Sequence, residues 1–296
     1  MIPEPQRTYL LELLNALGPA AQDFVIAGAQ AMKFAVEKAR GTKDFDFLLN
    51  VVALRKEPLQ LAQMFERLGY TPVPESRNFQ FEKSIPGSAE KMRIEFMAPE
   101  EYKREKDFRV DIQNGVHARA CTGGSIALAQ SDLHPIFGKL PNGDDFTAEI
   151  LVAQPHALVM LKLLALADRY SNIRGPKEAR HDREEAQTHA ADIVAIVTAV
   201  PDISRFNNLF VALLHNFCRN PFLVFACCEF FRTSFARSHR RASSSTRNTW
   251  LPTCPQIGRS LNLWLERPNW RNALSARFSR RRNSSPWRSQ WTTALR

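Results

Sequence analysis

Apolar residues recur along the chain with two different periods, and their order predicts an α+β fold. Apolar positions three or four residues apart indicate helices, whereas alternating or short continuous apolar runs indicate strands. The predicted helices cover residues 10–17, 29–38, 57–68, 155–169, 182–200 and 206–217. The predicted strands cover residues 24–27, 44–52, 78–81, 91–97, 108–112 and 146–152. We therefore expect a mixed sheet flanked by helices, followed by a helical C-terminal part.

A change in composition divides the chain further. Residues 1–200 hold 24 Lys and Arg against 27 Asp and Glu, whereas residues 201–296 hold 16 Arg, no Lys and 3 acidic residues. Such an abrupt change of charge marks a boundary. Apolar helical spacing continues past it and fades near residue 236. We expect an α+β domain at residues 1–153, a helical domain at 154–236 and a basic tail at 237–296.

The tail at residues 237–296 carries 13 Arg and one acidic residue, Glu266. Serine and arginine runs interrupt any apolar periodicity, so the composition predicts disorder. Three explanations stay open. The tail is a basic segment that binds RNA, a solvated tail without a role, or a stretch read out of frame, because exclusive use of Arg is typical of GC-rich DNA read in the wrong frame.

Other features of the composition predict a cytoplasmic protein without a membrane span. No apolar run reaches the roughly 20 residues that cross a bilayer. The first residues have neither the charged start nor the apolar stretch of a secretory signal. The five cysteines show no paired metal spacing, and an odd number without a signal indicates free thiols.

The chemistry of the sequence concentrates around Asp44 and Asp46. Side chains two residues apart in a strand share a face, so these carboxylates lie beside each other while Phe45 and Phe47 face the core. Neighbouring carboxylates repel unless a cation neutralises them, and hard oxygen ligands suit Mg²⁺ or Mn²⁺. Upstream, a strand runs through Gly28 into a helix, whose N-terminal N–H groups form a cradle for phosphate.

A two-metal site normally needs a third carboxylate, and two later strands offer one. Glu95 alternates with the apolar Ile94 and Phe96, so it joins the aspartates if its strand pairs with theirs. Asp111 is the competitor, and we prefer Glu95. Two metals held by shared carboxylates activate an attacking oxygen and stabilise a leaving pyrophosphate.

This stretch resembles the nucleotidyltransferase superfamily with the DNA polymerase β-like fold, and most closely its AbiEii/AbiGii toxin-like branch. The resemblance spans about residues 20–200. It rests on the Gly28 turn, on the Arg-x-Thr-x-Asp-x-Asp pattern that begins at Arg40, on an apolar helix with one lysine, Lys162, and on Asp192 in a late helix. Three departures are Ala29 in the turn, where Gly or Ser is usual, Glu95 in place of Asp, and Thr188-His189 in place of Lys-Asp.

The resemblance implies a role for each residue, and each role has a plainer alternative. Asp44, Asp46 and Glu95 are the expected metal ligands and catalytic carboxylates. The expected nucleotide-binding residues are Gly28, Ala29, Arg40, Thr42 and Lys162, with Arg169 and Asp192 as further site residues. Arg40 and Thr42 can instead simply order the turn, and Arg169 can complement a helix dipole. Lys162 can snorkel to water, and Asp192 can either anchor Lys162 or lie on a helix surface.

The implied function is transfer of a nucleoside monophosphate from a nucleoside triphosphate (NTP) to an RNA, a protein or a small-molecule acceptor, with Mg²⁺ or Mn²⁺ as cofactor. The alternative is a catalytically degenerate nucleotidyltransferase fold that acts as a binding component of a toxin–antitoxin or defence module, with an antitoxin-like protein partner. Ala29 and the altered Thr188-His189 motif favour the alternative. An assay with labelled NTPs, Mg²⁺ and total RNA discriminates the two.

Overall fold

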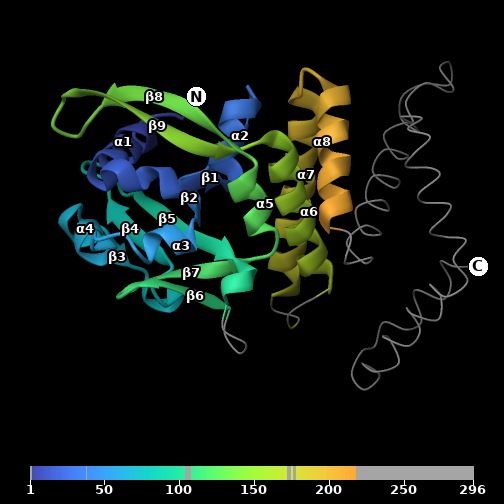
Figure 1. Cartoon of the computed structure of the whole chain (residues 1–296). Helices are drawn as coiled ribbons and strands as arrows, with labels where there is room; N and C mark the ends of the chain where they lie inside the picture. Colours follow the sequence, from blue (N-terminus) through green and yellow to red (C-terminus); the bar gives the residue numbers. More distant parts are fainter. Residues whose placement is uncertain (1, 38, 104–107, 172–174, 176–177, 218–296) are drawn as a thin grey trace, which may run out of the picture. The chain divides into compact units, whose positions relative to one another are not determined.

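A mixed β-sheet forms the centre of the protein, whose structure is a computed structural model (Figure 1). The structure describes residues 2–37, 39–103, 108–171, 175 and 178–217 of the 296-residue chain. The predicted tail at 237–296 lies outside the described residues, as does the C-terminal part of the predicted helical domain. The α+β class predicted from the sequence is confirmed.

The sheet contains nine described strands. They are β1 (Phe24–Ala27), β2 (Asp44–Leu49), β3 (Thr71–Pro72), β4 (Gln80–Ser84), β5 (Lys91–Pro99), β6 (Arg109–Gln113), β7 (Val116–Cys121), β8 (Ser131–Lys139) and β9 (Asp145–Ala153).

The strand order places the site strands in the middle of the sheet. The order is β3-β4-β5-β2-β1-β9-β8, and β7 pairs with both β5 and β6. The β1–β9, β2–β5 and β5–β7 pairs are parallel, whereas the others are antiparallel. Strand β2 is therefore central, with β1 on one side and β5 on the other.

The helices complete the described part of the chain. They are α1 (Gln6–Leu17), α2 (Gly28–Ala35), α3 (Val51–Leu54), α4 (Leu61–Arg67), α5 (Gly124–Ala129), α6 (Pro155–Ser171), α7 (Ala179–Ala199) and α8 (Ile203–Phe217), with short 3₁₀ turns at Gly18–Asp23, Pro74–Ser76 and Glu100–Tyr102. Figure 1 shows α6, α7 and α8 side by side, and α6 contacts both of the other two. Helices α2 and α5 each contact the sheet as well as α6.

Some elements differ from the sequence prediction in extent, and others were not predicted. Helix α6 begins at Pro155 as expected, because proline is well suited to the first helical turn. Helix α4 begins at Leu61, four residues later than predicted, with Pro58 preceding it. Strands β7 and β8 have no predicted counterpart. Strand β8 pairs with β9 along its full length, from Ser131 to Lys139. Among the described residues, no helix combines the length and apolarity that a membrane crossing requires.

An aromatic cluster on one face of the sheet forms the centre of the core. The ring of Phe96 on β5 lies 5.3 Å from that of Phe65 and 5.7 Å from that of Phe81, centroid to centroid. The rings of Phe24 and Phe47 lie 6.0 Å and 6.3 Å from it. All five side chains are buried. The alternation of β2 and β5 thus turns one face of each strand into this cluster and leaves the opposite face polar.

We expect Phe96→Ala to lower the free energy of unfolding by about 3–5 kcal/mol, because it removes a ring that contacts four others and leaves a cavity. Phe137→Ala is the matched control, since Phe137 is 57% exposed. It should change stability by no more than about 0.5 kcal/mol. Urea unfolding of both variants measures the difference. Similar losses in the two variants would contradict the assignment of Phe96 to the core.

Candidate active site

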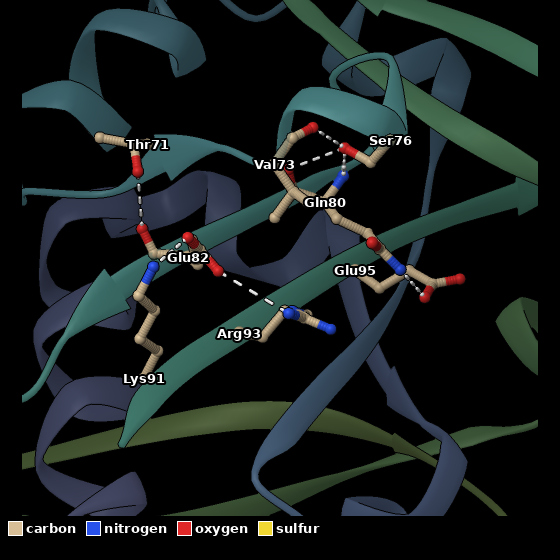
Figure 2. Close-up of polar contacts among 8 residues, drawn as sticks. All are labelled: Thr71, Val73, Ser76, Gln80, Glu82, Lys91, Arg93 and Glu95. Carbon is tan, nitrogen blue, oxygen red and sulfur yellow. Dashed lines mark hydrogen bonds and ion pairs between the residues drawn. The ribbon is translucent and has the colours of Figure 1, made fainter. Parts of the chain in front are cut away.

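The register of β2 and β5 brings the predicted carboxylates onto one face of the sheet. Asp46 pairs with Glu95, and Asp44 pairs with Arg93. On the other side of β5, Gln80 of β4 is the register partner of Glu95. Figure 2 shows the Gln80 and Glu95 side chains pointing toward one another from adjacent strands. The structure therefore places Glu95 beside Asp46, as the strand alternation indicated.

Asp111, the competing candidate for the third carboxylate, lies elsewhere. It belongs to β6, which pairs with β7 and not with β2. Its Oδ1 atom lies 3.4 Å from Nε2 of His117, its register partner on β7. Asp111 is thus separated from Asp46 by two intervening strands, β7 and β5.

Gly28 brings the start of α2 against the Asp46 carboxylate. Its φ is +61°, which is a left-handed conformation that favours glycine. A Cβ atom added to Gly28 would lie 1.7 Å from Oδ2 of Asp46, so no larger residue fits there. The first N–H groups of a helix have no partner within the helix and carry partial positive charge. The predicted phosphate cradle and the predicted metal ligand are therefore in direct contact.

The carboxylates of this face disfavour one another's ionised forms. Burial first, and the charge of Glu95 second, raise the pKa of Asp46 to about 7, while Arg119 and Lys162 act in the opposite direction. Desolvation also raises the pKa of Asp44, an effect opposed by Arg93 and reinforced by Glu95. Asp44 is exposed and Asp46 is half-buried. A bound cation would remove this conflict, because it favours the ionised form of both groups.

Glu95 already has protein partners on both of its oxygens. Gln80 Nε2 donates to Oε2 at 2.6 Å. Arg119 of β7 approaches Oε1 with Nε and Nη2, each at 2.7 Å. The Glu95 side chain is 15% exposed, and that of Arg119 is 45% exposed. Glu95 is therefore held in place by an ion pair and a hydrogen bond.

Asp192 of α7 joins the two cations that the sequence assigned to the nucleotide. Its Oδ2 lies 2.6 Å from Lys162 Nζ, and its Oδ1 lies 3.0 Å from Arg40 Nε. The side chains of Asp192 and Lys162 are 3% and 7% exposed, whereas that of Arg40 is 44% exposed. Burial lowers the pKa of Lys162, and Asp192 counteracts the shift. Lys162 neither snorkels to water nor lacks an anion, and Asp192 is not a surface residue.

The turn before β2 is ordered by hydrogen bonds from Thr42 and Gln30. The Thr42 hydroxyl accepts a bond from the Asp44 N–H at 3.3 Å, and Gln30 Nε2 donates to the Thr42 carbonyl at 3.1 Å. Gln30 is fully buried on α2, one residue after the buried Ala29. Within the described part of the chain, its Oε1 has no hydrogen-bond partner. Thr42 thus orders the turn, and its contact with a nucleotide stays a prediction.

Two positions complete the comparison of predicted and observed site residues. Arg169 lies in α6, but its side chain is outside the described residues. Arg119 was not identified from the sequence, because the alternation of Val116, Ala118 and Ala120 is too weakly apolar to indicate a strand. With β7 unassigned, nothing indicated that Arg119 faces Glu95.

The donor set fits a divalent cation at the two aspartates. Both offer hard carboxylate oxygens, which Mg²⁺ prefers, and burial, the largest cause of their raised pKa values, disfavours their ionised forms. Across the described ranges, no group of three or more His, Cys, Asp or Glu side chains is close enough to hold a metal. The carboxylate of Glu95 is engaged by Arg119 and Gln80. Asp44 and Asp46 would hold the ion, and Glu95 would join them on leaving Arg119.

The raised pKa of Asp46 predicts that the metal-free protein loses stability with rising pH. A carboxyl whose pKa is higher in the folded than in the unfolded state stabilises the fold at low pH, and this stabilisation is lost as the pH rises through the folded-state pKa of about 7. Asp44, Glu95, Arg119 and Lys162 are the charged groups that act on it. We expect the unfolding free energy to fall between about pH 4, the ordinary range of an aspartate, and about pH 7.

Thermal and urea unfolding of the metal-free protein across this range measure the effect. The slope should be shallower in Asp46→Asn. Asp145→Asn is the matched control, because it removes the same charge from a side chain that is 85% exposed. An equal slope in wild type and Asp46→Asn would show that Asp46 does not titrate differently in the folded state.

Gly28→Ala tests the contact between α2 and Asp46. The left-handed φ costs about 1–2 kcal/mol for a residue with a Cβ, and the clash with Asp46 adds about 1–3 kcal/mol of overpacking. Gly143→Ala is the control, since Gly143 has a φ of +92° and an added Cβ atom there would have nothing within 4 Å. Urea unfolding should show a larger loss for Gly28→Ala, and Asp46→Ala in the same chain should recover the difference. Equal losses at both glycines would exclude the contact.

Comparison with known proteins identifies the family. The family model described as nucleotidyl transferase AbiEii toxin, type IV TA system, matches residues 10–295. No curated protein matches the chain significantly. The chain is similar to the solution structure of the antibiotic-resistance factor ANT(2'')-Ia at 15% identity and a TM-score of 0.29, covering 74% of this chain and 100% of the other. A TM-score of this size does not establish a shared fold. The family model, in contrast, covers nearly the whole chain, and the protein belongs to the AbiEii nucleotidyl transferase toxin family.

Proposed function

We propose that the chain is a metal-dependent nucleotidyltransferase that transfers a nucleoside monophosphate from an NTP to an acceptor hydroxyl or phosphate. One observation carries the proposal, namely the contact of Asp46 with the glycine turn at the start of α2. It joins a ligand for a cation to N–H groups suited to a phosphate. A nucleoside triphosphate bound to a divalent cation presents both partners side by side.

The charges around this contact fit the same substrate. Lys162 acts electrostatically on Asp46, and we therefore include its buried ammonium group in the proposed site. Arg40 shares the Asp192 carboxylate with Lys162 and is partly exposed. We assign Gly28 and Ala29, through their backbone, and Arg40 and Lys162, through their side chains, to the triphosphate. Asp192 is then a positioning residue for the two cations.

The reaction is a displacement at the α-phosphorus. The acceptor oxygen forms a bond to this phosphorus while the bond to the bridging oxygen of the β-phosphate breaks, and pyrophosphate leaves with the electron pair. Where the acceptor is a hydroxyl, Glu95 helps to remove its proton; an ionised phosphate acceptor has none to lose. Bound Mg²⁺ or Mn²⁺ supplies charge stabilisation for the attacking and leaving oxygens. Asp44 and Asp46 would hold it, and the Thr42 hydrogen bond to the Asp44 N–H fixes the start of the strand that carries both.

The acceptor and the partner are part of the proposal. An RNA, a protein side chain and a small molecule all offer the required oxygen. The family description names a toxin of a type IV toxin–antitoxin system, so we include an antitoxin partner for this chain. We also propose a cytoplasmic location, which suits an NTP substrate. The altered positions Ala29 and Thr188-His189 favour the second candidate, a binding component without catalysis, and the assay below separates the two.

We expect purified protein to transfer label from an α-³²P-labelled NTP to an acceptor in total RNA or protein when Mg²⁺ is present. The double variant Asp44→Asn, Asp46→Asn should lose the transfer and the stabilisation by magnesium and nucleotide, because the amides keep the shape but remove the charge. Asp144→Asn, Asp145→Asn is the control, since these exposed residues lie outside the site.

Gel analysis of the labelled products and thermal unfolding with MgATP give the two measurements. Stabilisation by nucleotide without transfer would support the binding component instead of the enzyme. An unchanged thermal shift in the double variant, alongside a clear shift in wild type, would remove Asp44 and Asp46 from the site.

A further inference from the structure

Arg119 and Glu95 form an ion pair that cannot persist unchanged if Glu95 completes a metal site. Arg119 approaches a single oxygen of Glu95 with two nitrogens, Nε and Nη2, each at 2.7 Å. Gln80 occupies the other oxygen at 2.6 Å. A cation on Glu95 would therefore stand close to the guanidinium group. The cation and the Arg119 guanidinium group would repel each other strongly, because the site is partly buried.

The position of Arg119 allows its guanidinium group to reach a second anionic partner besides Glu95. The backbone of Arg119 is fixed by β7, where it is the register partner of Met97 on β5. Its charge acts on Asp46 as well as on Glu95. Its side chain is 45% exposed although that of Glu95 is only 15% exposed. An arginine carries five N–H donors in a planar fork, which suits bidentate contacts with phosphate oxygens.

We propose that Arg119 exchanges partners when substrate binds, and that it is a phosphate-binding residue held in reserve by Glu95. Before binding, Arg119 neutralises Glu95 and occupies the carboxylate oxygen Oε1. When the cation takes Glu95, Arg119 turns to the phosphates that arrive with the cation. This inference rests on the proposed function, because it requires a cation and a polyphosphate at the same site.

The exchange balances charge at each stage. The resting site compensates Glu95 with Arg119, and the loaded site compensates Glu95 with the cation and the phosphates with Arg119 and Lys162. A cation alone has to displace Arg119 without offering it a new partner, so it binds weakly. A cation with a polyphosphate offers that partner, so the two should bind cooperatively. Arg119 thereby couples the metal to the nucleotide.

The test uses the full-length protein, Mn²⁺ alone as one probe, and inorganic tripolyphosphate with Mg²⁺ as the other. Tripolyphosphate has no base, so its binding does not depend on base preference. We expect Arg119→Gln to bind Mn²⁺ alone about threefold or more tightly, because its competitor for Glu95 is gone, and magnesium tripolyphosphate about tenfold more weakly, because a charge-assisted contact is lost. Electron paramagnetic resonance of free Mn²⁺ and calorimetric titration measure the two affinities.

Arg93→Gln is the matched control. Arg93 is 43% exposed on the same face and lies on β5 two residues from Glu95, but its ion-pair partner is Glu82, at 3.7 Å (Figure 2). The Arg93→Gln substitution removes the same charge but leaves Glu95 paired with Arg119. Its gain in Mn²⁺ affinity should therefore be smaller than that of Arg119→Gln. Arg119→Lys keeps the charge and replaces Arg119→Gln as the test variant if the latter fails to fold. We expect its Mn²⁺ affinity to be near that of wild type and its tripolyphosphate binding to be weaker.

Opposite shifts of the two affinities in Arg119→Gln support the exchange, since an ion pair that only joins β5 to β7 would not strengthen metal binding. A parallel fall of both affinities, or unchanged Mn²⁺ binding, overturns it and leaves the proposed function standing. Equal gains in Mn²⁺ affinity for Arg93→Gln and Arg119→Gln also overturn it, because they indicate a general effect of charge. Wild-type protein that binds neither probe overturns both proposals.

Discussion

Three carboxylates, those of Asp44, Asp46 and Glu95, share one face of two paired strands, and the neighbouring cations offset the cost of burying and crowding their charges. Repulsion between like charges grows as water is excluded, and Asp46 is the less solvated of the two aspartates. Arg119 balances Glu95 directly, and Lys162 acts on Asp46 from α6. Cations from β7 and α6, together with Arg93 on β5 itself, thus favour the ionised carboxylates on this face.

The aromatic core supplies the rigidity that this arrangement requires. Residues that alternate with the carboxylates, Phe45, Phe47 and Phe96, are fully buried on the opposite face. Their packing fixes the register of β2 against β5, since a slip of one residue would turn carboxylates into the core and rings into solvent. The same alternation therefore determines both the stability of the sheet and the proximity of Asp46 to Glu95.

This alternation is also the reason why part of the site could be predicted from the sequence. The positions of Asp44, Asp46 and Glu95 follow from a period of two within single strands, and the Gly28 turn follows from a strand that ends directly before a helix. The AbiEii resemblance noticed at Arg40 and Lys162 agrees with the family that the chain belongs to. The local sequence pattern therefore predicted most of the residues that the structure brings together.

The remainder depends on contacts between segments that are far apart in sequence. Glu95 and Arg119 meet because β5 and β7 pair in parallel, and neither strand's pattern specifies that pairing. The hydrogen bond of the buried Gln30 could not be foreseen either, because its acceptor is the turn at Thr42 and not its own helix. Periodicity specifies which face a side chain occupies, but only tertiary pairing determines what it meets there.

The link between Arg40 and Asp192 has a consequence for the order in which contacts form during synthesis. These residues are 152 positions apart, and Asp192 also anchors Lys162. A ribosome-bound chain that has exposed β1 to β9 contains all three carboxylates but lacks Asp192, the ion-pair partner of both Arg40 and Lys162. The two ion pairs of Asp192 form only after α7 has been synthesised. The late position of Asp192 therefore delays this link between the turn before β2, α6 and α7 until most of the described part of the chain has been made.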